Sequence, residues 1–60
     1  MRKNWFVKIV FRHKTGNGRF VLRRRYNDLT WDEIFSVVSG QVVFHGENDY
    51  VSLMDIQEVA

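Results

Sequence analysis

Two stretches of alternating side chains, separated by a glycine-containing segment, constrain the fold most strongly. Residues 4–12, NWFVKIVFR, are rich in the aromatic and β-branched residues that favour strands. Residues 19–26, RFVLRRRY, repeat this composition after the segment HKTGNG, in which Asn17-Gly18 can supply the positive φ angles of a type I′ turn. The two stretches therefore predict an antiparallel β-hairpin.

The alternation also predicts which side chains share a face of this hairpin. One face is expected to join the core, and it carries Trp5, Val7, Ile9, Phe11, Phe20, Leu22 and Tyr26. The other face is expected to meet solvent, and it carries Phe6, Lys8, Val10, Arg12, Arg19, Val21, Arg23 and Arg25. Arg24 falls on the core face, so either the sheet leaves that end uncovered or Arg24 reaches an acid such as Asp28 or Asp32. The assignment requires a loop of even length, because an odd length would reverse the faces.

A helix start follows the hairpin directly. Thr30 is an N-cap residue and Glu33 lies three positions later, which is the pattern of a capping box. Leu29 and Ile34 occupy the positions of a hydrophobic staple around this cap. Asp32 and Glu33 also suit the positive end of the helix dipole. The helix is therefore expected to begin at residue 31.

The apolar residues of this helix recur at the spacing of one helical face. The stripe consists of Trp31, Ile34, Phe35 and Val38, at positions i, i+3, i+4 and i+7. We expect the stripe to face the core, although the same spacing would also suit a helix surface that binds a groove. Gly40 is the expected C-cap glycine, so the predicted helix covers residues 31–39.

The C-terminal third predicts a second hairpin. Residues 41–45, QVVFH, and 50–54, YVSLM, flank the turn segment GEND, with Phe44 opposite Val51 and Val42 opposite Leu53. Residues 55–60 either form a short helical turn or continue the strand. The resulting order, ββαββ, predicts a single α+β domain over residues 1–60. Its antiparallel sheet would have three or four strands, with one helix packed on one face.

The chain is short and has no chemical staple. A domain of 60 residues buries only about 60% of the surface that its unfolded chain exposes. No cysteine is present, so neither a disulfide nor a thiolate metal site can form, and a cytoplasmic compartment fits this composition. We expect neither a signal peptide nor a membrane span. Oligomerisation is the remaining route to stability, and a homodimer is expected.

Catalytic motifs are not evident. His13 and His45 are far apart in the sequence and have no companion ligands at metal-binding spacing, so no metal or cofactor is expected. Ser36 and Ser39 lie on the outer face of the predicted helix, without the strand–turn–helix elbow of a serine nucleophile. A pair of His45 with Asp49 is conceivable, but no nucleophile accompanies it. The prediction is therefore a non-enzyme.

Charge is completely segregated along the chain. All nine basic residues lie within positions 1–25 and all seven acidic residues lie from position 28 onward. Residues 1–27 therefore sum to +9 and residues 28–60 to −7. Such asymmetry indicates a charged partner, or one half of the chain neutralising the other.

Three functions remain open. The first is nucleic-acid binding through the basic hairpin face, with candidate contacts Phe6, Lys8, Arg12, Arg19, Arg23 and Arg25. The second is a small inhibitor or adaptor that binds another protein. In its size and its lack of cysteine and proline, the chain resembles the small orphan proteins of bacteriophages. Its candidate contacts are Asp28, Asp32, Glu33, Glu47 and Asp49. The third is self-assembly, either head-to-tail or two-fold, through an unpaired edge strand. The arginines could instead merely protect a sheet edge from aggregation.

Overall fold

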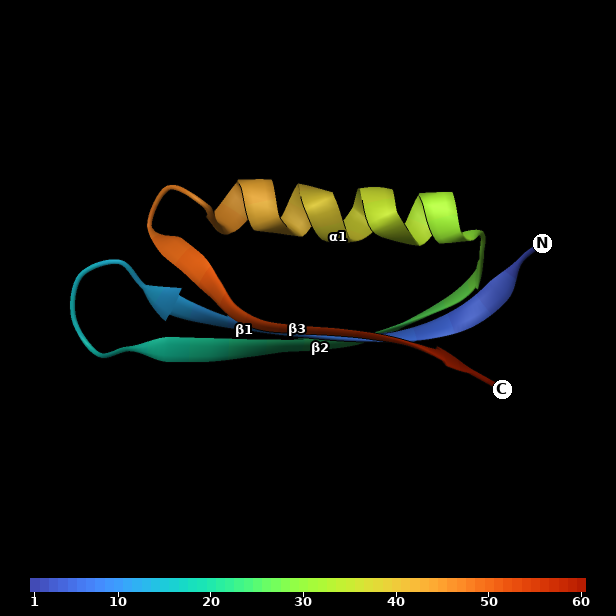
Figure 1. The fold of residues 1–60 in the computed structure, drawn as a ribbon, viewed down its shortest axis with the longest axis horizontal. Helices are drawn as coiled ribbons and strands as arrows, with labels where there is room; N and C mark the ends of the chain where they lie inside the picture. The colour runs from blue at the N-terminus through green and yellow to red at the C-terminus, as the bar shows by residue number, and fades with distance from the viewer.

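One helix lies across one face of a three-stranded antiparallel sheet (Figure 1). The structure is a computed structural model that describes all residues from 1 to 60. Its elements are β1 (Lys3–His13), β2 (Arg19–Leu29), α1 (Trp31–His45) and β3 (Asp49–Val59). The expected α+β class, antiparallel sheet and single covering helix are confirmed. The expected order ββαββ is wrong, because the chain forms only three strands in the order ββαβ.

β1 is the central strand, with β2 on one side and β3 on the other. Its core-facing side chains Trp5, Val7, Ile9 and Phe11 are all buried, and they pack with Ile34 and Val38 of α1. Since the helix covers only one face, the alternate residues of the strand lie on the uncovered face. No helix is long and apolar enough to cross a membrane.

The hairpin of β1 and β2 has the predicted facing. The Arg12–Arg19 pair is the last in the ladder, and the His13 backbone N–H donates to the Gly18 carbonyl oxygen at 3.0 Å. Four residues therefore remain in the loop, an even number, so Phe20, Leu22, Arg24 and Tyr26 lie on the helix side. A two-residue turn, for which positions 15–16, 16–17 and 17–18 were all possible from the sequence, does not form. Positive φ occurs instead at Gly16, at 93°, where a residue without a Cβ is favoured.

A bulge ends this hairpin next to the helix. The register shifts between Lys3 and Trp5, and Asp28 adopts a φ of 61°. The Asn4 side-chain oxygen accepts the Asp28 backbone N–H at 3.0 Å, and the Trp5 indole N–H donates to the Leu29 carbonyl at 2.9 Å. These bonds fix the direction in which the chain enters α1.

The helix starts as predicted but ends six residues later. Both bonds of the capping box form, since Glu33 N–H donates to Thr30 Oγ1 at 3.2 Å and Thr30 N–H donates to Glu33 Oε1 at 2.9 Å. Gly40 is an exposed position inside the helix rather than its C-cap, and the helix continues to His45. The predicted strand over residues 41–45 is therefore wrong.

Tertiary contacts explain the longer helix. The His45 ring lies 4.7 Å from the Phe11 ring and 4.9 Å from the Phe20 ring, centroid to centroid, which closes one end of the core. Such packing outweighs the weak preference of valines for strands and of glycine for a helix end. The expected pairs of Phe44 with Val51 and Val42 with Leu53 do not form, because Phe44 and Val42 belong to α1.

β3 is one continuous strand that pairs with β1 from Asn4–Val59 to His13–Asp49. Residues 55–59 therefore continue the strand, which settles the open choice for this segment in favour of the strand. A register shift between Val10 and Phe11 marks a bulge at Ser52. The bulge brings Val51 onto the helix side and Tyr50 onto the uncovered side.

Candidate nucleic-acid interface

The uncovered side of the sheet brings together all six residues of the predicted nucleic-acid site. Directly opposed residues of an antiparallel pair project from the same face. The ladder places Phe6 opposite Arg25, Lys8 opposite Arg23, and Arg12 opposite Arg19. We call this surface the open face. It consists of Phe6, Lys8, Val10, Arg12, Arg19, Val21, Arg23, Arg25, Tyr50, Leu53, Asp55 and Gln57.

β3 adds four residues to the open face that sequence reasoning did not assign to it. Tyr50 lies opposite Arg12, Leu53 opposite Val10, Asp55 opposite Lys8, and Gln57 opposite Phe6. The Tyr50 side chain is half exposed, as is that of Leu53. No sequence signal identified these positions, because their facing depends on how β3 pairs with β1, and that of Tyr50 depends also on the bulge at Ser52.

The open face is strongly cationic. It holds five cations and one carboxylate, a net charge of 5 − 1 = +4. The ion pairs of the molecule use other cations, namely Arg2 with Glu33 and Lys3 with Glu58, and the contact of His13 with Asp49 also lies outside the open face. The acidic half of the chain therefore contributes only Asp55 to the open face, opposite Lys8.

The five cations of the open face differ in whether they have a hydrogen-bond partner within the protein. The Arg25 guanidinium donates to the Asn27 side-chain oxygen and to the Ala60 carbonyl, each at 2.9 Å. The other four cations are Lys8, Arg12, Arg19 and Arg23. None of them makes a side-chain hydrogen bond or an ion pair within the protein. These four are the side chains best able to contact a ligand.

Arg24 separates from its neighbours, as the alternation predicted. It lies on the helix side, opposite Val7, and its guanidinium carbon is 5.5 Å from the centroid of the Tyr26 ring. The expected acidic partner, Asp28 or Asp32, is not found, because a cation–π contact with Tyr26 takes its place. The three consecutive arginines thus divide between two faces of the sheet.

An apolar row crosses the middle of the open face. Val10 is 8% exposed, and its neighbours Val21 and Leu53 are 38% and 48% exposed. Rows containing cations flank it on both sides, and Phe6 lies farther along β1 at 37% exposure. Cations bind phosphates, and exposed aromatic rings stack on bases, so this mixture suits an unpaired polynucleotide.

The acidic residues of the alternative protein-binding site do not form one surface. Asp28, Asp32 and Glu33 lie near the start of α1, whereas Glu47 and Asp49 follow its end. A 15-residue helix is about 22 Å long, which separates the two groups. Two of the five also have partners within the protein.

Glu33 and Asp49 are those two acids. The Thr30 backbone N–H lowers the pKa of Glu33, and Arg2 at 3.1 Å lowers it further. Asp49 is buried, and its Oδ1 lies 2.7 Å from His13 Nδ1. Sequence reasoning considered His45 for this pairing, but His45 packs among phenylalanine rings instead. No three His, Asp or Glu side chains cluster in a way that could hold a metal.

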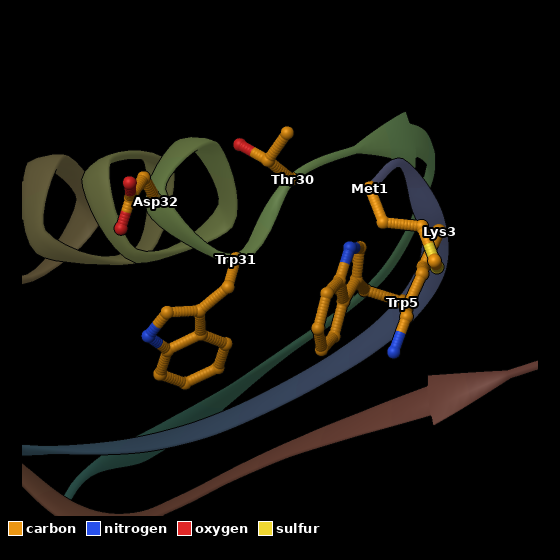
Figure 2. Close-up of a pocket in the computed structure, with 6 residues that line it drawn as sticks. All are labelled: Met1, Lys3, Trp5, Thr30, Trp31 and Asp32. Carbon is orange, nitrogen blue, oxygen red and sulfur yellow. The ribbon is translucent and has the colours of Figure 1, made fainter.

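A shallow hollow of about 360 Å³ lies where β1 meets the start of α1 (Figure 2). The Trp5 and Trp31 rings lie side by side in it, with centroids 5.6 Å apart. Its two charged side chains, Lys3 and Asp32, are not paired with each other, since Lys3 bonds to Glu58. The Thr30 hydroxyl in its lining accepts the Glu33 backbone N–H of the capping box.

Comparisons with protein-family models, with curated proteins and with solved structures find no match for this chain. A functional proposal therefore depends on the geometry and charge of the molecule itself. The open face carries five of the nine basic side chains of the protein.

Proposed function

We propose that this protein binds single-stranded nucleic acid on the open face. The observation that carries the proposal is the convergence of five cations on one uncovered sheet face, four of them without an internal partner. A polyanion is the ligand that would satisfy them together. Phosphate contacts supply most of the affinity in such complexes.

The pairing of the cations supports this proposal. Arg12 lies opposite Arg19, and Lys8 lies opposite Arg23. Like charges at directly opposed positions have Cβ atoms only about 5 Å apart and destabilise a sheet. An anion placed between two opposed cations would relieve this repulsion. A face that served only as a solvated surface would gain nothing from such pairs.

Two exposed aromatic side chains would contact the bases. Phe6 lies in one end row of the open face, and Tyr50 lies opposite Arg12 in the row at the other end. Phe6 and Arg12 are six residues apart on β1, which is about 20 Å along a strand. Stacking of a base on an aromatic ring contributes about 1–3 kcal/mol and tolerates any base. The proposed binding is therefore driven by charge and stacking rather than by sequence.

The width of the sheet favours a single strand over a duplex. The major groove of DNA, about 12 Å wide, admits an α-helix or a two-stranded ribbon. Here three strands at a spacing of about 4.8 Å form the face, and α1 covers its back. The flat open face suits an extended strand whose bases are already unpaired.

The test compares two neighbouring arginines on opposite faces. Arg23→Ala removes a free cation of the open face, and Arg24→Ala removes the same charge from the helix side. Binding of a labelled single-stranded oligonucleotide is followed by fluorescence anisotropy over a range of salt concentrations. Each lost phosphate contact lowers the slope of log K against log salt by about 0.7, which is roughly fivefold in affinity at 0.1 M salt.

Arg23→Ala is expected to show this loss, and Arg24→Ala is expected to keep the wild-type slope while losing stability. The lost cation–π contact with Tyr26 contributes about 0.5–1 kcal/mol at an exposed site. The absence of binding to single-stranded DNA and RNA at low salt would refute the proposal. Equal effects of the two variants would show that net charge, and not the open face, causes binding.

A further inference from the structure

A second surface of the protein is apolar and has no partner within the chain. It is a groove between α1 and β3, lined by Phe35, Val38, Ser39, Val42, Val43, Met54 and Ile56. Phe35 is 58% exposed, Val43 79% and Met54 43%, whereas the core helix residues Ile34 and Val38 are buried. Half of the predicted core stripe of the helix, Trp31 and Phe35, is therefore only partly covered.

The groove lies beside the unpaired outer edge of β3. The sheet order β2-β1-β3 leaves two edges, and they differ in protection. The β2 edge carries four arginines, a common defence against unwanted strand pairing: Arg19, Arg23, Arg24 and Arg25. The β3 edge has no basic residue and only three acids. It is therefore the edge better suited to pair with another strand.

The three acids of β3 are all engaged within the chain. His13 pairs with Asp49, Lys3 pairs with Glu58 at 3.1 Å, and the Gln57 side-chain amide donates to Asp55 at 3.0 Å. Lys3 thus neutralises one of the three carboxylates, and hydrogen-bonding groups of the chain contact the other two. Repulsion between two copies of β3 is correspondingly small, which favours a second copy of this chain as the occupant.

We propose that two copies form a two-fold dimer in which their β3 edges pair antiparallel and their grooves merge. The regular part of β3 after the bulge, residues 53–59, is centred on Ile56. A two-fold axis at Ile56 places Met54 opposite the partner's Glu58, and Asp55 opposite the partner's Gln57. No two carboxylates are then directly opposed. The arrangement is self-complementary, as a two-fold interface requires.

The available area predicts a weak dimer. An aromatic side chain has about 200 Å² of surface, so the exposed half of Phe35 offers roughly 100 Å² per copy. With Val43, Met54 and the strand edge, each copy would bury roughly 400 Å², or about 800 Å² in total, at the low end of interface sizes, where weak complexes are found. Dimerisation is therefore expected to depend on protein concentration. This proposal does not require nucleic-acid binding.

Two exposed phenylalanines on different flanks of α1 provide a matched test. Phe35 lines the groove, whereas Phe44 is 79% exposed and is not a lining residue. Sedimentation equilibrium is measured over a wide range of concentrations, at low and high salt. The wild type and Phe44→Ser are expected to dimerise, and Phe35→Ser is expected to remain monomeric with an unchanged circular-dichroism spectrum. A wild type that stays monomeric throughout overturns the proposal.

A spin label identifies the strands that pair, without altering the groove. The chain has no cysteine, so Gln57→Cys and Arg23→Cys each create a single labelling site. The distance is measured between the labels of the two copies, in units of the spacing of about 4.8 Å between neighbouring strands. The two labels at residue 57 are expected to lie within about two spacings of each other. The two labels at residue 23 are expected to lie about five spacings apart, or roughly 24 Å. The alternative is head-to-tail pairing of β2 of one copy with β3 of the next. In that arrangement association would be lost at high salt, and labels at residue 23 would lie only about three strand spacings apart. This result would refute the two-fold dimer.

Discussion

Replacing Gly40 with alanine tests the course of the helix, because the expected sign of the effect depends on where α1 ends. Gly40 lies inside α1, and a Cβ atom built on it meets nothing within 4 Å. In a helix interior, alanine is about 1 kcal/mol more favourable than glycine. Gly40→Ala should therefore stabilise the protein by about 1 kcal/mol, which raises the Tm of a domain this small by about 4–8 °C.

The opposite result would support the shorter helix that the sequence indicated. A C-cap glycine in the left-handed conformation costs roughly 1–2 kcal/mol when it gains a side chain. Gly16→Ala is the matched control, since Gly16 has a φ of 93° and also meets nothing within 4 Å. Urea unfolding followed by circular dichroism should show stabilisation for Gly40→Ala and destabilisation for Gly16→Ala. A loss of stability in both variants would refute a helix that continues to His45.

Three further predictions concern bonds that hold the ends of the elements. The pKa of Glu33 is lowered in the fold, so its contribution to stability is present above its ordinary value of 4.5 and is lost as pH falls through the lowered pKa. Urea unfolding from pH 3 to 7 should show a smaller acid loss for Glu33→Gln than for the wild type; equal losses would contradict this. Trp5→Phe leaves the half-buried Leu29 carbonyl without its indole donor and should lower the free energy of unfolding by about 1 kcal/mol; an unchanged value would argue against that bond. His13→Ala leaves buried Asp49 without its contact to the His13 ring and should destabilise by about 1–3 kcal/mol in the same assay, whereas a wild-type value would show that the pair contributes nothing.

Local patterns in the sequence predicted the local structure well. The alternation in residues 4–12 assigned the faces of β1, and the spacing of Thr30 and Glu33 located the start of α1. Both features depend on residues only a few positions apart. The end of α1 could not be predicted in this way, because it is fixed by the contact of His45 with Phe11 and Phe20, which are distant in the sequence.

The same distinction applies to the candidate sites. The hairpin cations share a face through alternation alone, so the sequence was sufficient to group them. Tyr50 joined them only through the pairing of β3 with β1 and a bulge, neither of which has a local signature. The exposure of Phe35 could not be predicted either. Helical spacing shows which residues share a face of the helix, but it does not show how many of them a three-stranded sheet can cover.

The position of β1 between its two neighbours has a consequence for folding. β1 precedes the other three elements in the sequence, yet its second partner, β3, follows them all, with Asn4 paired to Val59. A two-stranded hairpin alone is only marginally stable in water. Until residues 49–59 exist, Val7 and Ile9 have no strand on their second side. We therefore expect no stable folded portion before the final strand docks, and we expect the amide protons of β1 to exchange with solvent only through unfolding of the whole molecule.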